Sequence, residues 1–300
     1  MTDTMPHAGS ADVAAALLGW FDSAERDLPW RRKGVSPWHI LVSEIMLQQT
    51  PVVRVQPIWE QWVQRWPTPS AMAADPVGDI VRAWGKLGYP RRAMRLHECA
   101  GVLAERFDDT VPDDVDTLLT LPGIGDYTAR AVACFAYGQA VPVVDTNVRR
   151  VIARAVHGRA EPGNPSKTDL ADARSLLPPQ RRRAARFSAA LMELGALVCV
   201  AREPRCENCP LRSQCRWQQL GRPAHTGPAR KVQKFAGTDR QVRGLLLDVL
   251  RDSDSPVERA RLDQVWPTDP HQRMRALDSL LTDGLVELTA AGRYALPGEG

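Results

Sequence analysis

The chain has 300 residues, which allows one large domain or two smaller ones, and its 39 Lys and Arg against 35 Asp and Glu make it mildly basic. That charge suits a polyanionic partner but does not require one. No cationic segment precedes an apolar core in the first ten residues, and no apolar run approaches the roughly 20 residues that span a bilayer. We therefore expect neither a secreted nor a membrane-spanning protein, but a cytoplasmic one with reduced cysteines.

Residues 11–220 are predicted to be almost entirely helical. Apolar residues recur at helical spacing over 14–21, 40–46 and 55–66, and no alternating run of strand length stands out. Most of the nine tryptophans fall on these apolar faces, which favours a role in the core. Prolines mark the expected helix ends: Pro37, Pro51, Pro67, Pro69, Pro76, Pro112, Pro122 and Pro142.

A turn with two glycines, at residues 121–125, lies between two of the predicted helices. Gly123 and Gly125 permit positive φ and close approach of another backbone. The helix that begins near Asp126 presents free N–H groups at its positive end. Such a turn can hold a phosphate without recognising base sequence.

Four cysteines are clustered with the spacing C-x6-C-x2-C-x5-C over residues 199–215: Cys199, Cys206, Cys209 and Cys215. In a reduced compartment, such a cluster favours a metal site over disulfides. A zinc ribbon would show two close pairs, whereas one compact loop is typical of a [4Fe-4S] cluster, so we favour iron–sulfur over zinc. Nearby arginines suggest a phosphate contact, although the cluster would also stabilise the fold by itself. The two remaining cysteines, Cys99 and Cys134, are expected in the core.

The last part of the chain differs in character. Residues 221–238 have no apolar period and are predicted to be a linker. Three helices are expected at 240–251, 257–266 and 271–281, followed by two short strands at 285–288 and 293–296. Residues 239–300 therefore resemble a winged-helix-like α+β module. It serves either as a second nucleic-acid contact or as a packing module, and the sequence does not decide between them.

The turn and the residues after it carry a family resemblance. Tyr127-Thr128-Ala129-Arg130-Ala131 continues the second helix, and residues 143–148, which include Asp145, follow after Pro142. This stretch resembles the helix–hairpin–helix and aspartate of the base-excision DNA glycosylase superfamily. With the cysteine spacing, residues 11–217 resemble its endonuclease III and adenine glycosylase branch. The resemblance implies an all-α glycosylase fold over 11–220, double-stranded DNA as the partner, and a monomer associated with the nucleoid.

One position separates the two members of that branch. The bifunctional endonuclease III type has a lysine two residues after the second hairpin glycine, and its amine forms a Schiff base with the sugar. Here that residue is Tyr127. Residues 28–31, 42–50, 85–89 and 192–196 also match the motifs of adenine DNA glycosylases (the MutY type). The chain thus resembles a short, actinobacterial-like adenine DNA glycosylase, a monofunctional enzyme of base excision repair that removes adenine mispaired with 8-oxoguanine, G or C.

The resemblance and the chemistry together assign catalytic roles. Hydrolysis of the N-glycosidic bond requires an acid for the leaving base and an anion for the oxocarbenium-like sugar. We expect Glu44, on an apolar helix, to have a raised pKa and to act as the acid. Asp145, near a helix N-terminus, is expected to stay ionised and to stabilise the cation or attack it. Tyr127 and Asn147 would orient the aspartate and the sugar.

The target adenine must leave the stack before it reacts. By resemblance, Gln49 and Tyr89 are expected to form the wedge that fills the gap. Arg31 and Glu193 are expected in the adenine pocket, where Trp30 either stacks on the base or packs in the core.

The sequence departs from the family in two places. Typical members continue into a Nudix-like domain that recognises 8-oxoguanine, whereas only about sixty residues follow the linker here. Pro90 stands where a second tyrosine is common, which stiffens the wedge loop. Two alternatives stay open: an endonuclease III-like glycosylase and lyase acting on oxidised pyrimidines, and a non-catalytic iron–sulfur protein that binds DNA.

Overall fold

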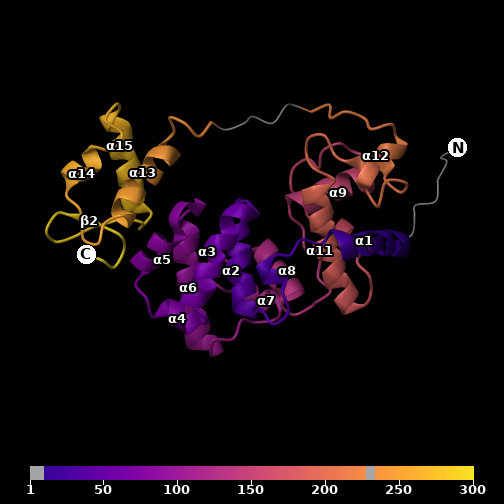
Figure 1. Cartoon of the computed structure of the whole chain (residues 1–300), viewed down its shortest axis with the longest axis horizontal. Helices are drawn as coiled ribbons and strands as arrows, with labels where there is room; N and C mark the ends of the chain where they lie inside the picture. The colour runs from indigo at the N-terminus through magenta and orange to yellow at the C-terminus, as the bar shows by residue number, and fades with distance from the viewer. Residues whose placement is uncertain (1–9, 228–233) are drawn as a thin grey trace. The chain divides into compact units, whose positions relative to one another are not determined.

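The computed structural model describes residues 10–227 and 234–300, and the chain forms two compact units (Figure 1). The first contains described residues from 10–35, 113–119 and 125–227. The second contains 36–112, 120–124 and described residues from 234–300. Residues 228–233 of the predicted linker and the first nine residues lie outside this description. Each unit is built from three separate segments, so neither is continuous along the chain.

Nine helical segments make up the described part of the first unit, and α11 packs against both α1 and α9. Its core gathers Leu17, Phe21, Ile152, Phe187 and Leu194, all of them buried. The apolar faces of three helices with helical spacing meet there, as amphipathic helices must. The segments are α1 (Ser10–Ala24), η1 (Pro29–Arg31), α7 (Val115–Leu119), α8 (Asp126–Phe135), α9 (Thr146–Ala155), α10 (Thr168–Leu176), α11 (Arg181–Leu197), η3 (Cys206–Asn208) and α12 (Arg216–Gln219).

The second unit begins with helices packed around tryptophans. Trp62 contacts Trp66 and Trp84 edge to face, with ring centroids 4.7 and 5.5 Å apart. The helical segments are α2 (Pro37–Leu47), α3 (Val52–Arg65), α4 (Pro69–Ala73), α5 (Val77–Trp84), η2 (Gly85–Leu87) and α6 (Arg91–Phe107). Prolines stand at the first position of α2 and α4 and at the N-cap of α3 and α5, as predicted.

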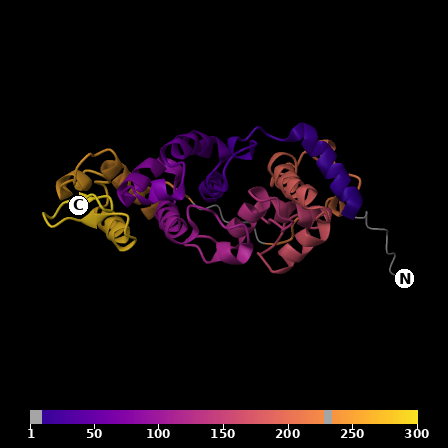
Figure 2. The same ribbon diagram turned by 90° about the horizontal axis from the view of Figure 1, so that it is seen from below.

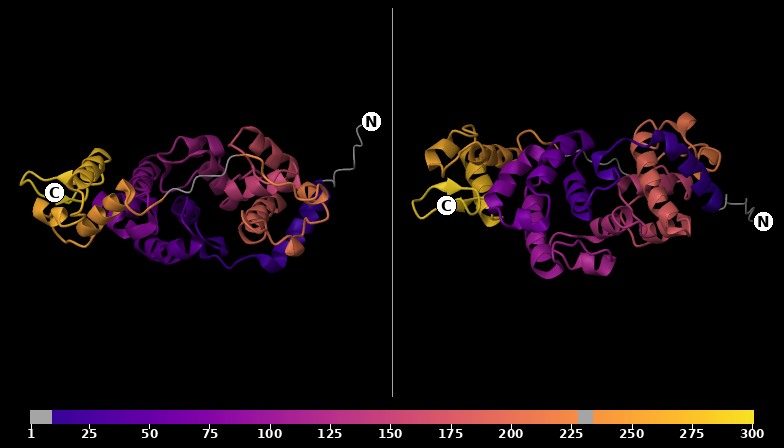
Figure 3. Two further views of the ribbon diagram at one scale, coloured as in Figure 1. Left: turned by 90° about the horizontal axis from the view of Figure 1, so that it is seen from above. Right: turned by 60° about the horizontal axis from the view of Figure 1, so that its bottom comes forward.

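Residues 234–300 pack against the α5 and α6 part of the same unit (Figures 2 and 3). They form α13 (Asp239–Arg251), α14 (Arg259–Asp263), α15 (Pro270–Thr282) and the antiparallel strands β1 (Glu287–Leu288) and β2 (Tyr294–Ala295). We call residues 239–300 the C-terminal module. Val81 of α5 and Met94 of α6 contact its apolar core. Arg82 donates to the backbone of Leu250 and to the carboxylate of Glu299.

The predicted elements are largely confirmed. In the described part of 11–220, the regular structure is helical, and Cys99 and Cys134 are fully buried. The second helix of the C-terminal module starts later than predicted, because Val257 is extended and exchanges two backbone hydrogen bonds with Tyr294, each 2.8 Å long. It also ends earlier, at Asp263, and Trp266 has a positive φ of +58° that a helix does not allow. The likeness to a winged helix stays a prediction. None of the helices in the described residues is long and apolar enough to cross a membrane.

Candidate active site and cysteine loop

Asp145 caps the N-terminus of α9. Its Oδ1 accepts a 2.7 Å hydrogen bond from the backbone N–H of Val148, and its Oδ2 accepts a 2.8 Å bond from the Asn147 side chain. Burial raises the pKa of Asp145, and these hydrogen bonds and the charge of Arg150 only partly oppose that effect. The helix start predicted for this residue is confirmed. The two hydrogen bonds hold the carboxylate in one orientation, and the residue is partly buried.

Asn147 is itself fixed by a buried arginine that the sequence did not single out. Arg150 donates to the Asn147 side chain (2.7 Å) and to the backbone carbonyls of Gly195 (2.6 Å) and Cys199 (2.6 Å). A methyl group at Gly195 would lie 2.7 Å from Asn147 Cβ, so α11 can approach the start of α9 only with glycine there. This chain of contacts joins the residue beside Asp145 to the first residue of the cysteine loop.

Glu193 is buried and lies at the centre of an ion-pair network with two partly buried arginines. Arg26 binds it through both carboxylate oxygens (2.7 and 2.8 Å), and Arg31 adds a 3.0 Å bond. Burial opposes ionisation, but the two arginines outweigh it, so the pKa of Glu193 is lowered. Arg31 Nη1 is buried and has no hydrogen-bond partner among the described residues. Glu193 therefore holds residues 26–31, including the buried Trp30, against α11.

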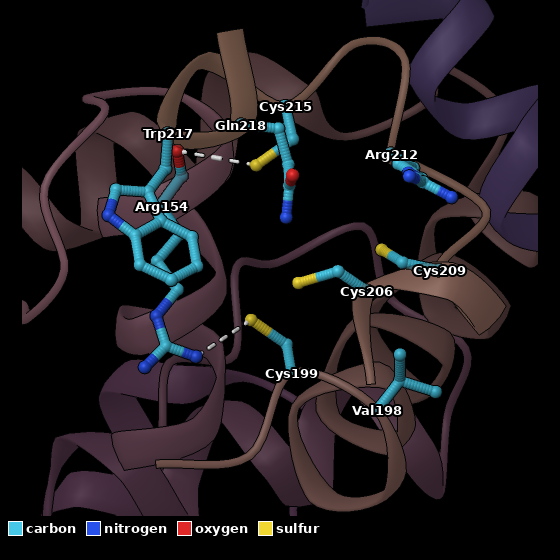
Figure 4. A pocket seen from close by; sticks show the side chains of 9 residues that line it. All are labelled: Arg154, Val198, Cys199, Cys206, Cys209, Arg212, Cys215, Trp217 and Gln218. Atoms are coloured by element: carbon cyan, nitrogen blue, oxygen red, sulfur yellow. Dashed lines mark hydrogen bonds between the residues drawn. The ribbon is translucent and has the colours of Figure 1, made fainter. Parts of the chain in front are cut away.

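The four cysteines of residues 199–215 line one pocket together with Arg154 and Trp217 (Figure 4). Arg154 Nη1 lies 3.4 Å from Cys199 Sγ, and its guanidinium lies 5.0 Å from the Trp217 ring. Burial raises the pKa of the Cys209 thiol to about 12 and also raises that of Cys215. Within the described residues, no three His, Cys, Asp or Glu side chains are close enough to hold a single metal ion. The donor set itself, four soft sulfur ligands around one pocket, fits an iron–sulfur cluster.

The two predicted catalytic carboxylates belong to different units. Glu44 lies on α2 in the second unit, between Ser43 and Ile45, and only 5% of it is exposed. Its predicted burial is confirmed. Tyr127 lies in the first turn of α8, where it packs beside Ala131.

The glycine turn joins α7 to α8 as predicted. Gly123 has φ +76°, and a methyl group there would lie 2.7 Å from Arg95 Cβ. Both glycine-specific properties are thus required at this position. Gly125 is the N-cap of α8, with an extended backbone. A cavity of about 200 Å³ beside the turn is lined by Gly123 and by residues of α6 and the end of α2: Ile45, Gln48, Arg91, Arg92 and Arg95.

The predicted wedge residues are both exposed, in the second unit. Tyr89 is 47% exposed and follows η2, and Gln49 follows α2. Both have positive φ, +49° and +57°, which is uncommon for residues other than glycine. Pro90 is the N-cap of α6 and fixes the backbone immediately after Tyr89.

Comparisons with known proteins show the family of the chain. The model of the HhH-GPD superfamily base excision DNA repair protein family matches residues 42–175. The chain is 69% identical to an adenine DNA glycosylase of Mycolicibacterium smegmatis, over 95% of this chain and 96% of that protein. It is 64% identical to one of Mycobacterium tuberculosis, over 95% and 93%.

Solved structures share the fold. A thermostable thymine-DNA glycosylase matches with a TM-score of 0.64 and 29% identity, over 70% of this chain and 97% of that one. Endonuclease III in a non-covalent DNA complex matches with a TM-score of 0.61 at 22% identity, over 71% and 98%. Each of these two structures covers about 70% of this chain.

The chain has a glycine hairpin, a helix-capping aspartate and an all-α fold shared with a DNA glycosylase of known structure. With the family match, these features define a helix–hairpin–helix protein of base-excision DNA repair. Within that class, near full-length identity of 64–69% decides the branch. The chain belongs to the adenine DNA glycosylase family.

Proposed function

We propose that this protein is a monofunctional DNA glycosylase that hydrolyses the N-glycosidic bond of adenine mispaired with 8-oxoguanine, G or C. The observation that carries the proposal is Asp145, a partly buried carboxylate held by Val148 and Asn147 at the start of α9. Family membership supplies the substrate class. Tyr127 supports the absence of a lyase step, because it places no amine two residues after Gly125.

Each carboxylate suits one role. Glu44, of which only 5% is exposed, would protonate the departing adenine. As the bond to the base breaks, positive charge develops on the sugar. Asp145, fixed in orientation, would stabilise that charge or form a bond to the sugar that water then cleaves. Asn147 and Tyr127 would keep the aspartate and sugar aligned.

Binding of the mispair would use separate surfaces. The Gly123 and Gly125 turn, with the arginine-lined cavity beside it, suits the phosphate backbone. Tyr89 and Gln49 would enter the stack from which adenine has been extruded. Arg31, whose Nη1 is buried without a partner among the described residues, would donate to adenine in a pocket that Trp30 and Glu193 complete.

The cysteines would hold a [4Fe-4S] cluster with a structural role, since the proposed hydrolysis needs no electron transfer. Cys199, Cys206, Cys209 and Cys215 are the ligands. Iron and acid-labile sulfide should be present in the purified protein and lost in Cys206→Ser, whereas Cys99→Ser, at a buried core site, should retain both. One bound zinc ion in place of iron would contradict this assignment.

The charge of the C-terminal module bears on whether the module contacts DNA. It contains eight Arg and no Lys, against eleven Asp and Glu. An excess of acidic residues is a poor match for a phosphate backbone, so we favour packing over a second nucleic-acid contact. A monomeric state and a cytoplasmic, nucleoid-associated location remain parts of the proposal.

The test is single-turnover base release from duplexes with adenine opposite 8-oxoguanine, G, C or T, with thymine glycol as the comparison substrate. We expect adenine release with strand breakage only after hot alkali, and loss of release in Glu44→Gln. Breakage at thymine glycol without alkali, with a borohydride-trapped adduct, would instead establish an endonuclease III-like lyase. Tight binding with no release from any duplex would establish the non-catalytic alternative.

A further inference from the structure

Two exposed loops of the second unit each contain a residue with a left-handed backbone. Gln49 (φ +57°) lies between Gln48 and Thr50, directly after α2, and Tyr89 (φ +49°) follows Gly88. An L-residue adopts such a backbone at a cost in free energy, and it persists only where the surroundings enforce it. The two loops therefore require contacts that hold the backbone next to both residues.

Arg92, on α6, contacts both loops. Its Nη1 donates to the carbonyls of Ile45 (2.8 Å), Met46 (3.2 Å) and Gln48 (2.6 Å), which α2 leaves without helical partners at its end. Its Nη2 donates to Thr50 Oγ1 (3.1 Å) and to the Gly88 carbonyl (3.0 Å). The carbonyl immediately before Gln49 and the carbonyl immediately before Tyr89 thus accept from the same guanidinium.

The face of the same group lies over aromatic rings. The Arg92 guanidinium carbon is 5.1 Å from the centroid of the Trp84 ring and 5.6 Å from that of Tyr89. Trp84 is fully buried and donates to the Gly88 carbonyl at 2.9 Å. Arg92 thus contacts both a ring of the core and the exposed tyrosine ring.

Only arginine satisfies this geometry. A planar fork donates in several directions at once and stacks on rings with its face, whereas the lysine ammonium is a single point with three donors. Lysine would keep the positive charge near the end of α2 but could not bridge both loops.

We propose that Arg92 is a positioning residue that holds Gln49 and Tyr89 as one preformed wedge. The inference rests on the proposed function, in which these two side chains enter the DNA stack as the adenine leaves it. A preformed wedge lowers the cost of ordering the two loops at the moment of extrusion. Loss of Arg92 would slow adenine extrusion and the base release that depends on it, without removing any group that reacts.

The experiment compares Arg92→Ala and Arg92→Lys with wild type and with Arg106→Ala. Arg106 is exposed at the far end of the same helix, where its guanidinium lies 5.7 Å from the centroid of the Phe107 ring. Extrusion is followed by the fluorescence of 2-aminopurine at the adenine position, in an Asp145→Asn background that does not cleave. Release is measured as the single-turnover rate opposite 8-oxoguanine and G, and thermal melting monitors the fold.

We expect both Arg92 variants to lower the extrusion signal and to slow release by about 100-fold. Arg106→Ala should match wild type. Added ethylguanidinium should restore part of the rate in Arg92→Ala, which a purely structural loss would not allow. If Arg92→Ala does not fold, Arg92→Lys and Thr50→Val decide, with about a 10-fold loss expected for the latter because it removes one of the bridging contacts.

Wild-type extrusion and release in a folded Arg92→Ala would overturn the inference, and so would full recovery of both in Arg92→Lys, since charge alone would then suffice. If wild type itself neither extrudes nor releases adenine, the proposed function fails and the inference fails with it. If wild type releases adenine normally and the Arg92 variants do so too, the inference about Arg92 fails while the proposed function stands.

Discussion

Asp145 combines its proposed catalytic role with an environment that disfavours its charge. The ordinary pKa of an aspartate is near 3.8, and burial raises that of Asp145 above this value in the folded protein. Below about pH 3.8 the carboxyl is neutral in both folded and unfolded chains. As the pH rises from about 3.8 to the raised pKa of the folded protein, the unfolded chain loses this proton before the folded one does. The residue therefore lowers stability at neutral pH.

Asp145→Asn should therefore abolish base release without weakening the fold. Asparagine caps a helix about as well as aspartate, so the bond from Val148 can be retained, and the buried charge is removed. We expect the rate to fall at least about 100-fold and the melting temperature at pH 7 to stay level or rise. The gain should disappear at acid pH, where the Asp145 carboxyl of the wild type is neutral in both the folded and the unfolded chain. A lower melting temperature at pH 7 would contradict this account.

Single residues differed in how far the sequence could identify them. The sequence predicts roles for Asp145 and the four cysteines because each lies at a fixed spacing from its neighbours along the chain. The contacts of Arg92 and Arg150 could not be predicted in this way, because their partners lie 47 and 49 positions away. Similarly, nothing local to Glu193 indicates that Arg26, some 167 positions earlier, neutralises it.

At the scale of elements, the hairpin between α7 and α8 depends on Gly123 for two separable reasons. Its φ of +76° disfavours any L side chain, and a methyl group there would collide with Arg95. Gly138 has a similar φ of +66° but open space around it. The pair therefore separates backbone strain from collision.

Gly123→Ala should lower the free energy of unfolding by about 1–3 kcal/mol and weaken DNA binding. Gly138→Ala should cost less, about 1 kcal/mol, and leave DNA affinity unchanged. Chemical denaturation and fluorescence anisotropy with a labelled duplex measure the two effects. Equal loss of affinity in both variants would mean that the hairpin does not contact the backbone of DNA.

The junction between α5 and the C-terminal module depends on Arg82. Its guanidinium joins the end of α13 to Glu299, and its side chain is 28% exposed. Loss of these partly buried, charge-assisted bonds in Arg82→Ala should cost about 1–3 kcal/mol. Hydrogen exchange should speed up in residues 239–300. Arg293→Ala, which breaks only an exposed pair with Glu258, should cost less than about 1 kcal/mol. Unchanged exchange in Arg82→Ala would show that apolar packing alone holds the module.

Helix positions could be predicted where the chain itself marks them. Proline and an apolar period fix the start of α2, and Asp145 fixes the start of α9. The start of α14 could not be predicted, because Val257 is drawn into an extended pairing by Tyr294, which lies 37 positions later. The order of helices and strands in the module was predictable, but its attachment to α5 and α6 was not, since no local signal encodes it.

Charge is unevenly distributed over the whole molecule. Eight of the 39 basic residues lie in the C-terminal module, but so do eleven of the 35 acidic ones. The excess of positive charge therefore lies in the remainder of the chain. Arginines there line the cavity beside Gly123, whereas Arg261 is exposed on the module. If phosphates bind only outside the module, Arg95 of that cavity and Arg261 should differ in their effect on DNA binding.

Arg95→Ala should therefore lower the slope of log affinity against log salt concentration by about 1, the value for one lost phosphate contact. Arg261→Ala should leave both slope and affinity as in wild type, because no phosphate would be near it. Each variant is titrated with a labelled duplex at several salt concentrations, first without a mispair and then with adenine opposite 8-oxoguanine. A reduced slope in Arg261→Ala on either duplex would return the module to the role of a second nucleic-acid contact. A reduced slope on the 8-oxoguanine duplex alone would place that contact at the mispair, since the undamaged duplex offers the same phosphates.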